Sequence, residues 1–429
     1  MRHKTLPDWL AWQETLHPDR IDLRLERVGQ VWSRLGPARF PCPVITVGGT
    51  NGKGSCVAYL DAIYRAAGYR CGCYTSPHLL RYNERIRIDG AEVSDEAICE
   101  AFARIDAARG DSLLTYFEFG TLAALDLFVR AELDVVVLEV GLGGRLDAVN
   151  IIDADVAVVT SIGSDHLEWL GTRPEQIAFE KAGIFRDGRP AVIGQRDAPS
   201  RLRTRALEIG ARPLQLGREY DYRLGAGQAV GDWDWQGPAG AARGALPAPA
   251  LRGRFQYDNA AAALCAIDCL QAQRPVPNAA VRQGLLRVQL RGRFTVLPGP
   301  VTWILDVAHN AEAAQALAAN LAAYPRSGKL MAVFSLLADK DAAAVVQALA
   351  DQVAHWHLTL APNIRAMSLE QLQGAADARA PGARSVCHAD VERALAAAAA
   401  AAEPGDCVLV FGSFTMVEAA LRSPWIAPV

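Results

Sequence analysis

The stretch Val47-Gly48-Gly49-Thr50-Asn51-Gly52-Lys53-Gly54-Ser55 decides how the first half of this chain is interpreted. It follows an apolar run that begins at Pro43 and precedes a helical pattern that extends to Ala67, so it joins a strand to a helix. Glycines let backbone N–H groups converge on an anion, the start of a helix attracts negative charge, and a lysine adds a positive charge. The stretch therefore predicts a phosphate-binding loop.

The loop departs from the standard phosphate-binding pattern at two places. That pattern has a glycine where this chain has Val47, and a serine or threonine where it has Gly54. One interpretation is a plain connection between a strand and a helix. The other is a shortened nucleotide loop in which Ser55, one position late, supplies the hydroxyl. Its place between a strand and a helix favours the nucleotide interpretation.

The composition is that of a globular protein with more than one domain. The chain has 429 residues, 51% of them hydrophobic, and 44 basic residues against 47 acidic ones. This balance predicts neither nucleic acid nor a membrane surface as a partner. Residues 1–12 lack the continuous apolar segment of a signal peptide, and no apolar stretch is long enough to span a bilayer. We expect a cytoplasmic protein whose nine cysteines are reduced thiols.

Strand-like apolar runs alternate with helical patterns, which indicates an α/β fold with mainly parallel sheets. The pattern fails between about 215 and 250, where we expect short antiparallel strands and loops. Proline and glycine at 298–300 mark a domain boundary. We expect an N-terminal domain over 1–295, a linker at 296–298 and a smaller Rossmann-like α/β domain over 299–429. The expected strands cover residues 44–47, 134–140, 156–161, 191–194, 303–307, 330–334, 356–360 and 407–411.

Polar side chains follow several of these strands, at the edge where α/β proteins bind ligands. Glu139 ends one strand, and its carboxylate could hold Mg²⁺. His166 follows the next strand and could be a further metal ligand, although a lone histidine in a loop is more often structural. The glycine-rich turn 141–147 between them suits the close approach of a substrate, or it caps the strand with its charges in solvent.

Lys181 lies in the apolar setting Phe179-Glu180-Lys181-Ala182-Gly183-Ile184-Phe185. An amine in such surroundings is more readily neutral, and a neutral amine can react with CO₂ to give a carbamate that binds metal. The alternative is a partly exposed lysine at the end of a helix.

In the second domain, Asp306, His309 and Ser413 follow strands in the same way and are expected to line its ligand edge. A structural interpretation of these strand ends is also open, in which Asn310 and Ser413 cap the helices that follow them.

Taken together, these motifs resemble the folylpolyglutamate synthase/dihydrofolate synthase family of the Mur ligase superfamily. The resemblance spans nearly the whole chain in order. The segments that carry it are 49–55, Thr75-Ser76-Pro77-His78-Leu79, Tyr116-Phe117-Glu118, Leu138-Glu139-Val140-Gly141-Leu142-Gly143-Gly144-Arg145-Leu146-Asp147, Asp165-His166, 180–185, Asp306-Val307-Ala308-His309-Asn310 and Gly412-Ser413-Phe414. The N-terminal segments 6–10, 16–18 and 21–23 look like those of the bifunctional bacterial members.

The resemblance implies a Mur-ligase-like fold and an ATP-dependent amide ligase. Its substrates would be dihydropteroate, folates and L-glutamate, joined through an acyl phosphate. Both reactants of the first step are anionic, so Lys53 and Mg²⁺ would neutralise charge and align the attacking oxygen. Two Mg²⁺ sites are implied, and a monovalent cation is a further candidate cofactor.

The resemblance also implies the roles of individual residues. Ser76, Glu139 and His166 would bind magnesium, and Lys181 would be a carbamoylated lysine at the second metal position. Lys53, Lys181 and His309 would be catalytic, and the chain would be a monomer. The nucleotide would contact Gly49, Thr50, Asn51, Gly52, Lys53, Gly54, Ser55, Asn259, Arg293 and Asp306, and the other substrates Thr115, Phe117, Asp147, His309 and Ser413.

Two other functions stay open on the sequence alone. A Mur-type ligase would act on a nucleotide-linked sugar peptide with the same chemistry. A nucleotide-dependent switch would use the phosphate loop without ligation, but it would leave the polar strand ends at Asp306, His309 and Ser413 without an obvious task.

Overall fold

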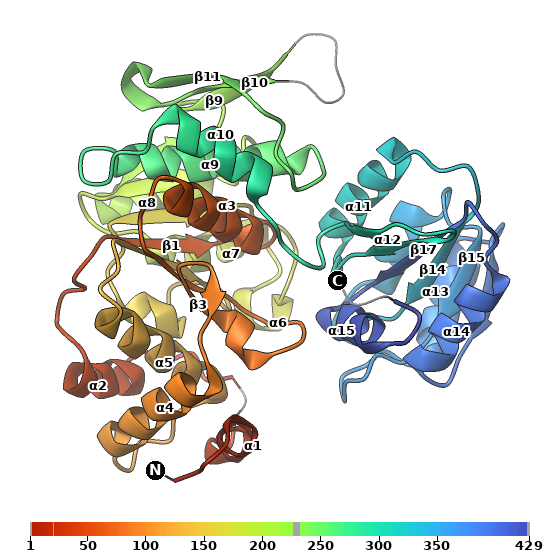
Figure 1. Cartoon of the computed structure of the whole chain (residues 1–429), viewed down its shortest axis with the longest axis horizontal. Helices are drawn as coiled ribbons and strands as arrows, with labels where there is room; N and C mark the ends of the chain where they lie inside the picture. Colours follow the sequence, from red (N-terminus) through yellow and green to blue (C-terminus); the bar gives the residue numbers. More distant parts are fainter. Residues whose placement is uncertain (1, 20, 226–231, 427–429) are drawn as a thin grey trace. The chain divides into compact units, whose positions relative to one another are not determined.

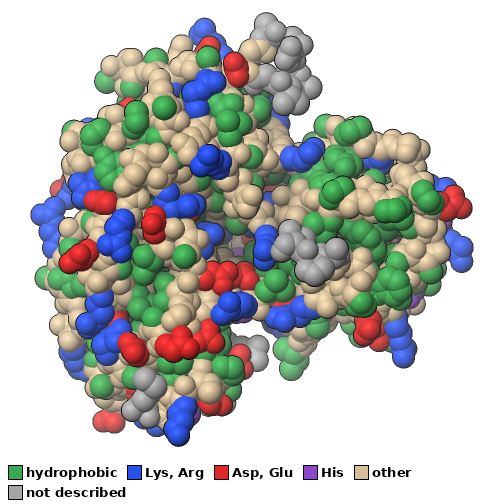
Figure 2. All heavy atoms as spheres, viewed as in Figure 1, with side chains coloured by type: hydrophobic (Ala, Val, Ile, Leu, Met, Phe, Trp, Pro, Cys, Tyr) green, Lys and Arg blue, Asp and Glu red, His purple; other side chains and the backbone are tan. Residues whose placement is uncertain are grey.

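The structure is a computed structural model that describes residues 2–19, 21–225 and 232–426. The chain divides into two compact units (Figure 1). Unit 1 comprises Met1–Gly163, Leu167–Ala250 and Gln256–Val288, and unit 2 comprises Ser164–His166, Leu251–Phe255 and Gln289–Val429. On the face seen in Figure 2, basic and acidic side chains are interspersed, as the nearly equal numbers of the two charges lead one to expect.

Unit 1 is built on an eight-stranded sheet with the order β4-β3-β2-β5-β1-β6-β7-β8. In this order all neighbours from β2 to β8 are parallel, and only the pairs β2–β3 and β3–β4 are antiparallel. Strand β1 lies in the middle, and the chain places β2 and β5 on one side of it and β6 on the other. Such a reversal of strand order is where open α/β sheets bind ligands. The strands are β1 (Val44–Gly48), β2 (Cys71–Tyr74), β3 (Ile86–Ile88), β4 (Ala91–Glu92), β5 (Val135–Glu139), β6 (Val156–Val159), β7 (Pro190–Ile193) and β8 (Arg212–Gln215).

Helices cover this sheet, and local sequence signals begin several of them. Ser94 caps α4, and Thr115 caps α5 in a capping box with Glu118. Helices α1, α2, α4 and α5 pack together, and α3 packs along α10 (Figure 1). The helices are α1 (Leu6–Leu16), α2 (Glu26–Leu35), α3 (Lys53–Ala66), α4 (Asp95–Arg109), α5 (Tyr116–Arg130), α6 (Leu167–Leu170), α7 (Pro174–Lys181), α8 (Ser200–Ile209), α9 (Phe255–Cys269) and α10 (Asn278–Arg287), with 3-10 turns at Tyr82–Arg85, Ala148–Ile151, Ala182–Ile184 and Pro238–Gly240.

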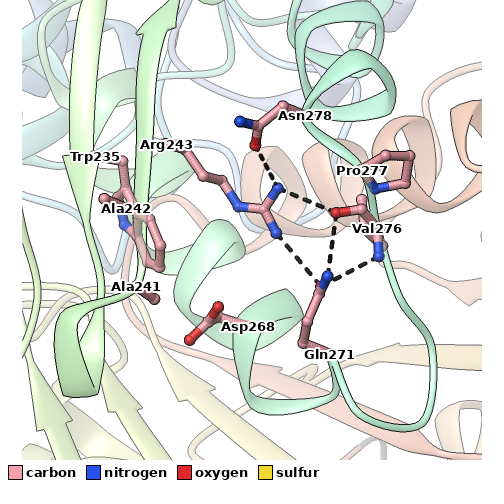
Figure 3. A pocket seen from close by; sticks show the side chains of 9 residues that line it. All are labelled: Trp235, Ala241, Ala242, Arg243, Asp268, Gln271, Val276, Pro277 and Asn278. Carbon is pink, nitrogen blue, oxygen red and sulfur yellow. Dashed lines mark hydrogen bonds between the residues drawn. The ribbon is translucent and has the colours of Figure 1, made fainter.

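A separate antiparallel sheet in unit 1 contains β9 (Asp221–Leu224), β10 (Trp233–Gln236) and β11 (Ala242–Leu246). Arg243 of β11 is buried and joins this sheet to the start of α10. Its guanidinium donates to the Val276 carbonyl at 3.1 Å and to Asn278 Oδ1 at 2.8 Å, beside a cavity of about 340 Å³ (Figure 3). Burial lowers the pKa of Arg243, which nearby Asp268 partly offsets. Because its guanidinium donates to acceptors within the chain, we interpret Arg243 as a structural link.

Arg243→Met is expected to lower the free energy of unfolding by about 1–3 kcal/mol, because the buried Val276 carbonyl and the Asn278 side chain lose their donor. Urea unfolding followed by circular dichroism measures this difference. Arg218→Met, at an exposed arginine between β8 and β9, is the control and should change stability by less than about 0.5 kcal/mol. Equal stability of the two variants would show that Arg243 does not hold the sheet in place.

Unit 2 is built on a six-stranded sheet with the order β12-β13-β17-β14-β15-β16. Only β12 runs antiparallel. Its strands are β12 (Thr295–Leu297), β13 (Thr302–Leu305), β14 (Leu330–Phe334), β15 (His355–Leu358), β16 (Arg384–Cys387) and β17 (Cys407–Phe411). Its helices are α11 (Ala311–Ala323), α12 (Ala342–Leu349), α13 (Leu369–Arg379), α14 (Val391–Ala401) and α15 (Phe414–Arg422).

The expected α/β class with mainly parallel sheets is confirmed. Each expected strand overlaps an observed one, and the structure adds strands that the apolar runs did not mark, such as β2 and the edge strand β16. Among the described residues, no helix has both the length and the apolar character needed to cross a membrane. All nine cysteines are free thiols.

Candidate active site

The phosphate loop connects β1 to α3 and needs glycine at two positions. Gly49 and Gly52 have φ angles of +141° and +89°, which side chains rarely adopt. A Cβ at Gly49 would lie 2.0 Å from Thr160 Oγ1, and one at Gly52 would lie 2.3 Å from Asn259 Oδ1. The loop is therefore a close-packed backbone cradle rather than an open turn.

The segment after β6 holds the loop in place. The Thr50 N–H donates to the Ser161 carbonyl at 2.8 Å, and the Asn51 N–H donates to Ser161 Oγ at 3.0 Å. The hydroxyls of Thr160 and Ser161 both donate to the Asn51 carbonyl, at 2.6 and 3.0 Å. These bonds fix the carbonyls of the loop, so that its remaining N–H groups can face an anion.

Two lysine ammonium groups meet at one carbonyl of the loop. Lys53 Nζ donates to the carbonyls of Gly49 and Thr50 at 3.0 and 3.2 Å. Lys181 Nζ, from the end of α7, donates to the same Gly49 carbonyl at 3.1 Å. Lys181 is only 4% exposed, so the alternative of a partly exposed lysine is wrong. Two lysine side chains from different elements thus converge on the phosphate loop.

Ser55 and Asn259 meet at a buried glutamine. Gln256 Nε2 donates to Ser55 Oγ at 3.3 Å, and Asn259 Nδ2 donates to Gln256 Oε1 at 3.2 Å. All three side chains are buried. Gln256, on α9 one turn before Asn259, was not selected from the sequence, because only the tertiary structure brings α9 to the loop. The spacing of Gln256 and Asn259 on one helix face was the available signal.

Glu139 and Ser76 lie together at the carboxyl edge of the sheet. Glu139 ends β5, pairs in register with Val47 of β1 and is 5% exposed. Its Oε2 accepts from the Ser76 backbone N–H at 3.2 Å. A carboxylate and a hydroxyl one strand away from the phosphate loop fit Mg²⁺, which binds few protein oxygens and keeps waters and phosphates as its other ligands.

The glycine-rich turn after β5 carries Asp147 beside an aromatic ring. Asp147 accepts from the backbone N–H groups of Leu142 and Val149 at 2.8 and 3.1 Å. Burial raises the pKa of this carboxyl to about 6, against the lowering effect of these backbone donors and of Lys53. The Phe117 ring packs on Gly141, where a Cβ would lie 2.6 Å from its Cζ.

Thr115 precedes this ring by two residues and is engaged in the α5 cap. Its Oγ1 donates to Glu118 Oε2 at 2.9 Å and accepts from the Glu118 N–H at 3.2 Å. The structure thus brings Phe117 and the turn that carries Asp147 into contact, with Thr115 at the start of the same helix. The Phe117 ring, packed on the turn that carries the Asp147 carboxylate, suits a flat heterocycle with N–H donors.

Unit 2 contains a charged cluster around Asp165. His309 Nδ1 donates to the Val307 carbonyl at 2.8 Å, and its Nε2 lies 3.3 Å from Asp165 Oδ2. Lys340 forms an ion pair with the other Asp165 oxygen. Burial raises the pKa of Asp165, but the His309 hydrogen bond and the neighbouring positive charges outweigh burial and hold that pKa well below its usual range.

Lys340 was not selected from the sequence, although it too follows a strand, β14, in a run of charged residues. His166, the expected metal ligand, belongs to the same short segment as Asp165. Its backbone has a φ of +52° and its N–H donates to Asp165 Oδ1 at 2.9 Å.

The other expected residues of unit 2 lie at strand ends and helix starts. Asp306 accepts from the N–H groups of Phe294 and Ala308, both at 2.8 Å. Burial raises the pKa of Asp306, and the nearby Arg293 charge opposes that rise. Ser413 Oγ accepts from the Met416 N–H at 3.2 Å, and Asn310 caps α11, so the structural interpretation of both as helix caps is confirmed.

Comparisons with known proteins agree with this arrangement. Residues 47–267 match the Mur ligase middle domain, and residues 292–414 match the Mur ligase glutamate ligase domain. The chain is 44% identical over 414 residues to the dihydrofolate synthase/folylpolyglutamate synthase of Escherichia coli, covering 96% of this chain and 94% of the relative. The protein of the same name from Haemophilus influenzae is 40% identical, with 96% of each chain covered.

Solved structures show the same likeness across the fold. A FolC protein of Escherichia coli in complex with DHPP and ADP superposes with a TM-score of 0.91 at 43% identity, covering 98% of this chain and 97% of that chain. A folylpolyglutamate synthase of Mycobacterium tuberculosis complexed with ADP has a TM-score of 0.87 at 31% identity, covering 97% and 98%. A further relative was solved with Mn, AMPPNP and L-glutamate bound, and has a TM-score of 0.88 at 43% identity, with 97% of each chain covered. With its Mur-ligase fold and phosphate loop, the chain belongs to the dihydrofolate synthase/folylpolyglutamate synthase family of ATP-dependent ligases.

Proposed function

We propose that this chain adds L-glutamate both to dihydropteroate and to tetrahydrofolates. In each case the acceptor carboxylate attacks the γ-phosphate of ATP, which gives an acyl phosphate and ADP. The glutamate amine then displaces the phosphate to form the amide. The observation that carries the proposal is the Lys53 ammonium on the Gly49 carbonyl, inside a cradle next to Glu139, because its positive charge can bring two anionic reactants together there.

The nucleotide is assigned to the cradle formed by residues 49–55. The N–H groups of the loop that Ser161 does not engage and the ammonium of Lys53 would bind the phosphates, and Asn259, beside Gly52, is assigned as a further nucleotide contact. In unit 2 we assign nucleotide contacts to Arg293 and Asp306. Relatives solved with ADP and with AMPPNP support a nucleotide site in this family.

Divalent metal is assigned to Ser76, Glu139 and His166, with Lys181 as a carbamate at a second position. When bound, Mg²⁺ supplies positive charge that polarises the transferred phosphoryl group. Residues of the chain position the metal. Glu139 and Ser76, which are hydrogen-bonded to each other, would supply ligands on one side, and Lys181, which contacts Gly49, would supply a ligand next to the phosphate loop. A monovalent cation is a further candidate cofactor.

The pteroyl group is assigned to Thr115, Phe117 and Asp147 in unit 1. The expected linker at 296–298 overlaps β12, which belongs to the sheet of unit 2, so we place the boundary earlier than expected. In unit 2 we assign His309 and Ser413 to the incoming glutamate, and His309 also as catalytic. Ser413 caps the first turn of α15, and a carboxylate is favoured at the start of a helix.

The test is a mass measurement of products from dihydropteroate, L-glutamate, ATP and Mg²⁺, repeated with tetrahydrofolate as the acceptor. We expect one added glutamate on dihydropteroate and one or more on tetrahydrofolate, each with stoichiometric ADP. Absence of product with both acceptors would overturn the proposal. ATP turnover stimulated only by a UDP-linked acceptor would favour a Mur-type ligase instead.

The raised pKa of Asp147 predicts a pH dependence of substrate binding. The carboxylate is present above about pH 6 and is lost as the pH falls below it, so the KM for dihydropteroate should rise by up to about tenfold per pH unit below pH 6. Initial rates between pH 5 and 8 measure the profile, with the KM for ATP as the internal control. The rise should disappear in Asp147→Asn, and an unchanged profile in this variant would remove Asp147 from pterin recognition.

We further propose a monomer that works in the cytoplasm. Light scattering at the concentration of the activity assay tests the oligomeric state, and a mass near 46.1 kDa is expected.

A further inference from the structure

Arg27 connects helix α2 to the first turn of α5. Its Nε donates to both oxygens of Glu118, at 3.0 and 2.9 Å, and its Nη1 donates to Asp22 Oδ2 at 2.6 Å. Glu118 is 3% exposed, so Arg27 supplies the positive charge that a buried carboxylate requires. The contact joins residues far apart in the sequence. Asp22 belongs to the 21–23 segment, to which the catalytic assignment gives no task.

Glu118 in turn fixes the start of α5. Its Oε2 accepts from both the N–H and the hydroxyl of Thr115, at 2.8 and 2.9 Å. Phe117 lies inside the same turn and presses its ring on Gly141. A shift of Glu118 would therefore move the cap and the ring together, relative to the turn that carries Asp147.

We infer that Arg27 is a positioning residue for recognition of the pteroyl group, acting through Glu118 on Thr115 and Phe117. This inference rests on the proposed function, which assigns those two residues to the pteroyl group. Arg27 is separated from that group by Glu118, so its loss weakens binding of the acceptor without removing a group that reacts. Asp22, in the 21–23 segment that resembles the bifunctional members, contributes to this task by holding Arg27.

The same helix offers a matched control. Arg104 of α4 donates to buried Asp126, two turns further along α5, at 2.9 and 2.6 Å. Both arginines neutralise a buried carboxylate of α5 from a neighbouring helix. Without the arginine, Glu118 keeps the neutral groups of Thr115, whereas Asp126 keeps the guanidinium of Arg130. Only the Arg27 contact lies at the end of α5 that carries Thr115 and Phe117.

The experiment compares Arg27→Gln, Arg27→Lys and Arg104→Gln in the full chain. We expect Arg27→Gln to raise the KM for dihydropteroate about tenfold, while kcat and the KM for ATP stay within about twofold. Arg27→Lys should recover part of the loss, because an ammonium keeps the charge but not the two-sided contact. Arg104→Gln should also lower the thermal midpoint, although by less because Arg130 still pairs with Asp126, and should leave the KM for dihydropteroate within about twofold.

Binding of dihydropteroate and of ADP, measured by calorimetry, separates this inference from the proposed function. Weaker binding of dihydropteroate with unchanged binding of ADP in Arg27→Gln supports the positioning role, even if turnover is absent. If Arg27→Gln does not fold, the same comparison is made between Arg27→Lys and Arg104→Lys. An equal effect of the Arg27 and Arg104 variants on dihydropteroate, or no effect of either, would overturn the inference, whereas a wild-type chain that forms no product overturns only the proposed function.

Discussion

Replacement of Lys53 with methionine is expected to lower kcat by about 10²–10³-fold, the usual effect of removing one preorganised donor to a developing charge. The Lys53 ammonium is held inside the loop by the carbonyls of Gly49 and Thr50, so its charge is in place before an anion arrives. Methionine keeps the length of the stem and removes only the charge. The KM for ATP should rise as well, because the ground-state phosphates also lose a contact.

Initial rates at saturating ATP, together with calorimetric binding of ADP, measure the two parts of this effect. Lys4→Met, at an exposed lysine before α1, is the matched control and should behave like the wild type. A Lys53→Met variant that keeps more than half of the wild-type kcat would show that the loop binds nucleotide without promoting the transfer.

Lys181→Ala is expected to lower kcat by about 10²-fold or more, because a buried group that contacts the loop is lost and a cavity is left at the end of α7. In the proposed carbamate, the neutral amine attacks the carbon of CO₂, a C–N bond forms and one proton is released. The carbamate keeps an N–H that can still donate to the Gly49 carbonyl, and its oxygens become available to a cation.

Two measurements distinguish a carbamate from a simple ammonium at Lys181. Carbon-13 NMR in labelled bicarbonate should show a carbamate signal in the wild type that is absent from Lys181→Ala. High bicarbonate should not restore the variant, whereas a small carboxylate such as acetate, which can enter the space left by the side chain, should restore part of the activity. Near-normal turnover of Lys181→Ala, or no carbamate signal in the wild type, would remove the carbamate from the mechanism.

The fold follows from the sequence wherever a strand is buried on both faces. Strands β1 and β5 are continuous apolar runs, and both were placed to within a residue or two at each end. Strand β2 was not expected, because Cys71-Gly72-Cys73-Tyr74 is short and contains a glycine. Strand β16, at an edge and largely exposed, lacks the burial that would have selected for an apolar pattern.

Residues of the candidate site were predictable where a polar side chain ends or directly follows a strand, as Glu139 and Asp306 do. The contacts that join different segments were not, because their partners are set by packing rather than by local sequence. Burial of Lys181 against Gly49 is one such contact, and the approach of Gln256 to Ser55 is another. Both depend on where α7 and α9 meet the loop.

The close approach of Gly52 to Asn259 also limits how the sequence can vary. Any side chain at position 52 would have to displace the Asn259 amide, and the positive φ there disfavours one in any case. A residue bulkier than asparagine at position 259 would press on the loop backbone in the same way. Substitutions at positions 52 and 259 are therefore coupled. Among homologues we expect the two residues to change together or to be conserved together.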